Sequence, residues 1–121
     1  MSLSIEKQFQ KLCQDGKLKE VKELWEKNPT INTTANINSA FRIACNNGHI
    51  DIVKWLFEIK PDIDIYLYKN YGTINLFSKN KIIIQYLHKI DEYQYLTEEK
   101  ERIEKNLQKI NEKIEKVKRK L

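Results

Sequence analysis

A repeat of 32 residues constrains the fold of this chain more than any other feature of its sequence. Shifting the sequence by 32 positions aligns ten residues with residues of similar type, including a glycine and a proline. The aligned pairs are Phe9/Phe41, Cys13/Cys45, Gly16/Gly48, Leu18/Ile50, Val21/Val53, Leu24/Leu56, Trp25/Phe57, Pro29/Pro61, Ile31/Ile63 and Asn32/Asp64. Self-similarity at such a period is the signature of a repeat architecture.

Each copy predicts two short helices joined by a tight turn. In the first copy, apolar residues at helical spacing form two stripes, which are Ile5, Phe9, Leu12 and Cys13, then Leu18, Val21, Leu24 and Trp25. Gly16 marks the turn between them, because glycine readily takes the left-handed backbone of a helix exit, and Pro29 ends the second helix. The second copy follows the same plan, with Ser39 as the expected N-cap of its opening helix. Residues 30–38 and 62–73 are expected to form extended turns.

The second copy resembles a known family. Residues 44–56 read A-C-N-N-G-H-I-D-I-V-K-W-L, similar to the A-A-x-x-G-H-x-x-I-V-x-x-L core of an ankyrin repeat. Residues 39–42 occupy the place of the family's T-P-L-H, and Asp64 that of its closing Asn or Asp. Residues 55–64 are similar to ankyrin repeats of giant DNA viruses of amoebae, and the 19 lysines, 17 isoleucines and 11 asparagines are typical of AT-rich genomes. The resemblance implies an all-α solenoid that binds proteins and has no catalytic residues.

A third, degenerate unit follows the two clear copies. A shift of 31 aligns residues 83–87 with residues 52–56 in type, but the third unit lacks the turn glycine. We interpret residues 74–79 and 81–90 as a worn helix pair with one residue deleted at its turn. Asn80 is expected to adopt the left-handed conformation there. Irregular terminal units are typical of solenoids, because they close the open end of the core.

The last 31 residues change to a seven-residue period. Heptad position d holds Leu96, Ile103, Ile110 and Val117, and position a holds Tyr93, Lys100, Leu107, Ile114 and Leu121. Asp91 with Gln94 forms a capping arrangement. Acidic residues gather in the first turns and basic residues in the last, which complements the helix dipole. We therefore expect an ankyrin-like domain at 1–90 and an amphipathic or coiled-coil helix within 91–121, helical over most of 92–120.

The apolar stripe of this helix, here called the seam, needs a cover. The seam consists of Leu96, Ile103, Leu107, Ile110, Ile114, Val117 and Leu121, interrupted by Lys100. In a parallel dimer Glu99 would face Glu104 of the other helix, which is repulsive. Lys113 and Lys118 would repel each other in the same way. An antiparallel pair instead sets Glu99 near Lys120, so we predict antiparallel pairing, either with a second copy or with the body of the same chain.

The residue inventory argues against catalysis, and we expect no enzyme activity, cofactor or metal. The only cysteines, Cys13 and Cys45, cannot form a disulfide framework and are expected to be buried thiols in a reducing cell. His49 and His88 lie 39 residues apart, with no cysteine placed to complete a metal set. Three glycines leave no glycine-rich phosphate loop.

Charge and hydropathy restrict the classes of partner and the cellular location that we expect. The net charge is +5, but only three arginines occur and lysine alternates with acidic residues, so nucleic-acid recognition is not favoured. No apolar run approaches the roughly 18 residues of a membrane span, and the N-terminus does not resemble a signal peptide. We therefore expect an intracellular, cytoplasmic protein, located in the host cytoplasm or the virion if it is viral.

These observations favour recognition of a protein partner. In ankyrin proteins the first helices and the inter-repeat fingers face the partner, and the residues expected to face outward there are Gln10, Gln14, Arg42, Asn46, Tyr66, Tyr68 and Tyr71. His49 is expected to tie helix ends by hydrogen bonds, and the C-terminal helix to serve oligomerisation or docking. The alternatives are a structural coiled-coil protein with a vestigial ankyrin head, or weak binding of nucleic acid or anionic membrane through the lysine-rich tail.

Overall fold

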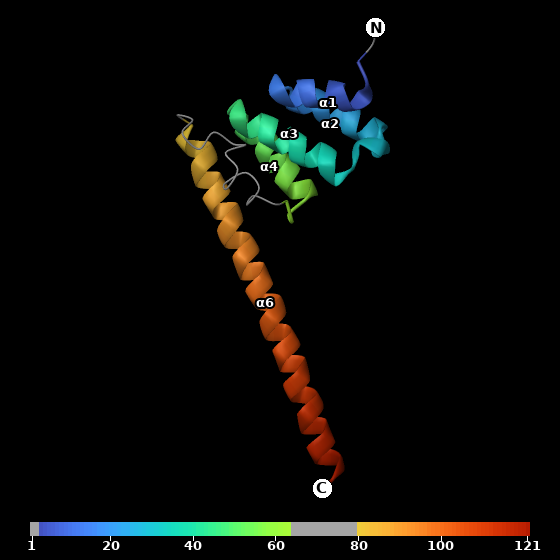
Figure 1. The fold of residues 1–121 in the computed structure, drawn as a ribbon, viewed down its shortest axis with the longest axis vertical. Coiled ribbons are helices and arrows are strands. Elements are labelled where there is room, and N and C mark those ends of the chain that lie inside the picture. The colour runs from blue at the N-terminus through green and yellow to red at the C-terminus, as the bar shows by residue number, and fades with distance from the viewer. Residues whose placement is uncertain (1–2, 64–79) are drawn as a thin grey trace. The chain divides into compact units, whose positions relative to one another are not determined.

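A computed structural model describes residues 3–63 and 80–121 (Figure 1). In chain order its helices are α1 (Ile5–Gln14), α2 (Leu18–Lys27), the 3-10 helix η1 (Pro29–Ile31), α3 (Thr34–Asn46), α4 (Ile50–Ile59) and α6 (Lys81–Arg119). The described residues contain no strand, and the predicted all-α fold class is confirmed. Two compact units result, Met1–His88 and Lys89–Leu121. The short helix predicted at 74–79 lies outside the described residues.

Two helix pairs build the core of the first unit. α1 packs against α2 and against α3, and α3 packs against α4. Equivalent positions of the two copies are buried together, namely Phe9 and Phe41, Cys13 and Cys45, Val21 and Val53, and Ile31 and Ile63. The repeat in the sequence is therefore a repeat of core positions. Figure 1 shows the two pairs stacked in the order expected of a solenoid.

An aromatic cluster connects the two helix pairs. The ring centroids of Trp25 in α2 and Trp55 in α4 lie 5.8 Å apart, with the rings nearly perpendicular at 86°. Phe9 in α1 lies 6.0 Å from Trp25 and 6.3 Å from Trp55. Aromatic pairs in such arrangements contribute about 0.5–1.5 kcal/mol each beyond their burial. Both tryptophans therefore stabilise the stack of helix pairs.

The opening helix of the second copy begins earlier than its sequence predicts. The side chain of Thr33 accepts a hydrogen bond from the backbone N–H of Asn36 at 3.2 Å, which caps α3. Ser39 lies inside α3, so its predicted role as the N-cap is wrong. The extended turn predicted over 30–38 is wrong for the same reason. Burial of Ile37, one turn before buried Phe41, favours the earlier start because it adds apolar contact to the helix.

In the third repeat, Asn80 has a different role from the one expected. The backbone N–H of Ile83 donates to Oδ1 of Asn80 at 3.3 Å, so Asn80 caps the start of α6. No described residue except glycine has a positive φ, and the predicted left-handed conformation of Asn80 is therefore wrong. Ile83 and Leu87 are buried, as are Ile52 and Leu56, which lie 31 residues earlier. The shift of 31 thus aligns equivalent core positions.

The C-terminal heptads belong to one helix of 39 residues, α6. The predicted helix over 92–120 is confirmed as far as Arg119, but its predicted start at Asp91 is wrong, because Asp91 lies inside α6. Neither glycine nor proline occurs between Lys81 and Arg119, so no residue breaks the helix at the capping arrangement. In the second unit, every residue from 100 to 121 is exposed.

Candidate protein-binding face

Four of the residues predicted to bind a partner lie on two adjoining helices. Gln10 and Gln14 belong to α1, and Arg42 and Asn46 belong to α3. Gln10 and Arg42 are 32 residues apart, as are Gln14 and Asn46, so each pair occupies equivalent positions of the two copies. Within each helix the two residues are four apart and share one side. Because α1 packs against α3, the four side chains form one set, here called the polar face.

The polar face is accessible although it borders the core. Gln14, Arg42 and Asn46 are exposed, and Gln10 is half-buried. Each of the four directly follows a buried residue of its helix, and these neighbours are Phe9, Cys13, Phe41 and Cys45. Successive helical residues point about 100° apart, so the core side chains fix the helices while the polar ones point away from the centre of the core. Amide groups donate and accept hydrogen bonds, and a guanidinium offers five donors.

An amide-rich hollow continues this surface beyond the end of α3. Its lining includes Asn46, Asn47, Gly48, Asn80 and Lys81. Asn46 belongs to the polar face, so the hollow borders that face directly. Among the described residues, none that lines it carries a carboxylate. The surface thus offers donors and one positive charge, which suits carbonyl or carboxylate oxygens of a partner.

The remaining candidates in the inter-repeat segment are not placed by the structure. Tyr66, Tyr68 and Tyr71 lie outside the described residues. The structure therefore places only the four helical candidates, on the adjoining helices α1 and α3. The contribution of the tyrosines to binding stays a prediction.

The turns beside the polar face contact each other from one repeat to the next. Gly16 and Gly48 have φ of 74° and 76°, the left-handed conformation that their sequence position predicts. Nε2 of His49 lies 2.8 Å from the carbonyl oxygen of Gln14, which confirms the predicted hydrogen-bonding role of His49. A Cβ atom on Gly16 would lie 2.7 Å from Cε1 of that ring. The histidine therefore fits against the preceding turn because residue 16 has no side chain.

Asn80 takes the place of His49 in the next repeat, and sequence reasoning missed this role. A Cβ atom on Gly48 would lie 2.7 Å from Nδ2 of Asn80, just as one on Gly16 would meet His49. His49 directly precedes α4 and Asn80 directly precedes α6, each the second helix of its repeat, and the two residues are 31 positions apart. The shift of 31 contained this signal, because it aligns Asn80 with His49 and not with the turn glycine.

The two cysteines are packing residues of the core. Both Cys13 and Cys45 are free and buried, as predicted. Burial raises the pKa of the Cys13 thiol to about 12, and burial also raises the pKa of the Cys45 thiol. Thiolate formation at neutral pH is therefore strongly disfavoured, which makes both groups poor nucleophiles.

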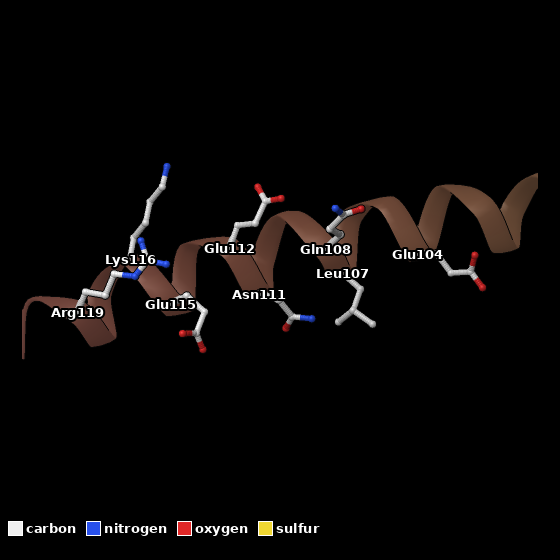
Figure 2. A pocket seen from close by; sticks show the side chains of 8 residues that line it. All are labelled: Glu104, Leu107, Gln108, Asn111, Glu112, Glu115, Lys116 and Arg119. Atoms are coloured by element: carbon white, nitrogen blue, oxygen red, sulfur yellow. The ribbon is translucent and has the colours of Figure 1, made fainter.

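A second hollow runs along the C-terminal helix. All of its lining side chains come from α6 between residues 104 and 119 (Figure 2). Figure 2 shows these side chains spreading away from a single ribbon, with Leu107 among polar and charged neighbours. The hollow is therefore a groove between side chains of one exposed helix rather than an enclosed binding site.

Residues 3–63 and 80–121 contain neither a metal-binding cluster nor a membrane-spanning helix. In that part of the chain, no three His, Cys, Asp or Glu side chains gather closely enough to hold a metal ion. None of its helices combines the length and apolarity needed to cross a membrane.

Comparison with known proteins finds one family match, within the first unit. Residues 9–57 match the family model of ankyrin repeats, which occur in many copies. The match covers the region of α1 to α4, including the polar face and both turn glycines. Searches of curated proteins and of solved structures gave no match. The ankyrin part of the resemblance is thus confirmed for these residues, and the viral relationship stays a prediction.

Proposed function

We propose that this protein is a non-catalytic protein-binding module that recognises its partner through the polar face of α1 and α3. Ankyrin repeats are generally protein–protein interaction modules, and residues 9–57 match that family. The observation that carries the proposal is the placement of Gln10, Gln14, Arg42 and Asn46 at equivalent, accessible positions of two packed repeats. A partner would meet hydrogen-bonding groups already held in place by the core.

The chemistry of the face favours a partner surface rich in oxygen acceptors. Arg42 is exposed, and its planar guanidinium group can donate several hydrogen bonds to carboxylate or carbonyl oxygens. The neighbouring hollow adds asparagine amides and Lys81, with no carboxylate among its described lining residues. Arginine is also among the residues whose truncation costs most at protein interfaces. We therefore assign Arg42 the central role and the amides the supporting hydrogen bonds.

The buried cysteines bear on the cellular location of the protein, and the C-terminal helix bears on a second role. Two buried free thiols are typical of proteins in a reducing compartment, which supports an intracellular, cytoplasmic location. The exposed heptad helix supports a second role, in which the tail associates with another helix while the head binds the partner. The viral origin suggested by residues 55–64 would extend that location to a host cell.

Capture from an extract of the native cells tests the polar face. The full chain is immobilised, retained proteins are identified, and the affinity of each is compared with that of Arg42→Ala. We expect Arg42→Ala to weaken the captured partner by about 1–2 kcal/mol, or roughly 5- to 30-fold. Lys22→Ala on α2 is the matched control, because it also removes one exposed cation.

The outcome is read together with thermal unfolding of each variant. Surface substitutions of this kind change stability by about 0.5 kcal/mol or less. Loss of capture by Arg42→Ala alone, with unchanged unfolding, supports the polar face. Equal capture by both variants would place recognition elsewhere, and unfolding of Arg42→Ala would show that Arg42 is structural.

A further inference from the structure

The second unit, residues 89–121, presents an apolar stripe to solvent that only Lys100 interrupts. Six seam residues of α6 have exposed fractions of 54–62%, and they are Leu96, Ile103, Leu107, Ile110, Ile114 and Val117. Leu121, the last seam residue, is fully exposed. Single exposed apolar residues are ordinary, whereas six aligned over about 32 Å of α6 mark an interaction surface. α6 has no turn before Arg119 that would let it fold back on itself.

We propose that the seam is covered by the seam of a second copy of this chain, in an antiparallel two-stranded coiled coil. In antiparallel pairs, residues at position a of one helix lie opposite residues at position d of the other. The heptads allow Leu107 to lie opposite Ile110 of the second copy, and Ile114 opposite Ile103. The same register brings Leu121 opposite Leu96. Every apolar seam residue except Val117 then has an apolar counterpart.

Lys100, the interruption in the seam, is tolerated in this arrangement. It lies opposite Val117 near one end of the paired region. The two copies of Lys100 are then separated by 17 residues, or about 25 Å of helix. Nζ of Lys100 lies 3.9 Å from Oε1 of Glu104, so a carboxylate one turn away accompanies its charge. In the dimer its aliphatic stem can pack in the seam while the ammonium group stays in water. A parallel dimer would bring the two Lys100 ammonium groups together in its core.

The charges beside the seam select the orientation and the register. In the proposed register the flanking pairs are Glu99/Lys120, Asn106/Lys113, Thr97/Lys118 and Glu104/Asn111. Each pair occurs twice in the symmetric dimer, and none joins like charges. The Glu99/Lys120 pair is attractive, and the other three each set a charged group against a neutral one. Complementary flanking charges set partner choice and orientation in coiled coils.

Other arrangements of two copies are opposed by like charges. In a parallel dimer Glu99 would face Glu104. Shifting the antiparallel pair by one heptad in one direction sets Glu104 against itself. Shifting it in the other direction sets Lys113 against itself. The register centred between residues 108 and 109 is the arrangement among these that pairs the seam without such contacts.

The oligomeric mass of the full chain tests the pairing. Light scattering at high micromolar concentration is expected to give twice the chain mass of 14.5 kDa. Ile110→Asp is expected to raise the dissociation constant by at least about 100-fold, because the carboxylate is buried against Leu107 in both halves of the dimer. Gln108→Asp, which adds the same side chain at an outer position of the same helix, is expected to remain dimeric.

Charge reversal then tests the orientation. Glu99→Lys is expected to weaken the dimer about 3- to 10-fold, because the introduced ammonium group of each copy would face Lys120 of the other. Combining Glu99→Lys with Lys120→Glu is expected to restore the dimer. A parallel dimer predicts the opposite, since Glu99→Lys would then relieve a contact with Glu104. Stronger association of Glu99→Lys would overturn the antiparallel arrangement, and a monomeric wild-type chain would overturn the proposal itself.

Discussion

At the scale of single residues, the clearest requirement is the absence of a side chain at the turn of the second repeat. Gly48 has φ of 76°, and a Cβ atom there would lie 2.7 Å from Nδ2 of Asn80. Gly48→Val is therefore expected to lower the free energy of unfolding by about 1–2 kcal/mol or more, as measured by urea titration. Gly48→Asn is the matched control and should cost less, because asparagine tolerates the left-handed region. If both variants lost the same free energy of unfolding, the steric contact with Asn80 would matter more than the left-handed backbone.

The roles of single residues were predictable where the ankyrin pattern specifies both the position and the residue type. The left-handed glycines and the hydrogen bond of His49 were readable, because the turn position and the histidine recur in the ankyrin pattern. The cap formed by Asn80 was not, because asparagine fits both a left-handed turn and an N-cap. Which of these it adopts depends on where the following helix begins.

At the scale of elements, the start of α3 provides a direct comparison of two hydroxyl residues. Thr33 accepts the capping hydrogen bond from Asn36, whereas Ser39 lies within the helix. Thr33→Ala is expected to cost about 0.5–2 kcal/mol of stability in chemical denaturation. Ser39→Ala should be close to neutral, because alanine has the higher helix propensity. A larger loss for Ser39→Ala would restore the later helix start that the sequence pattern predicted.

The helix boundaries were the least predictable part of the fold. The apolar stripes located all five α-helices among the described residues, but two starts were misplaced, at Ser39 and at Asp91. In both cases a capping residue was given priority over helix-forming residues before it. A cap is worth about 1 kcal/mol, whereas burying one large apolar side chain such as Ile37 is worth about 1.5–3 kcal/mol. Burial therefore decides where α3 begins.

At the scale of the whole molecule, the chain combines two units with different kinds of surface. The first has a packed core and the polar face, and the second has an exposed heptad helix. The all-α fold and the repeated helix pairs were predictable from the spacing of apolar residues, whereas their ankyrin character was implied by the resemblance of residues 44–56 to that family. The polar face could be predicted only for residues on regular helices, since an offset of 32 fixes their equivalence. The three tyrosines have no such periodic constraint.

The central claim is that the first unit recognises the protein partner and that the C-terminal helix associates with a second copy of the chain. Capture of the partner by two variants, compared side by side, tests it. Ile110→Asp disrupts only the seam, and Arg42→Ala disrupts only the polar face. We predict that Ile110→Asp retains the partner captured by the wild-type chain, with at most a loss of avidity from the separated dimer. Arg42→Ala should lose it about 5- to 30-fold. Loss of the partner by Ile110→Asp with full retention by Arg42→Ala would contradict the account, because recognition would then reside in the tail.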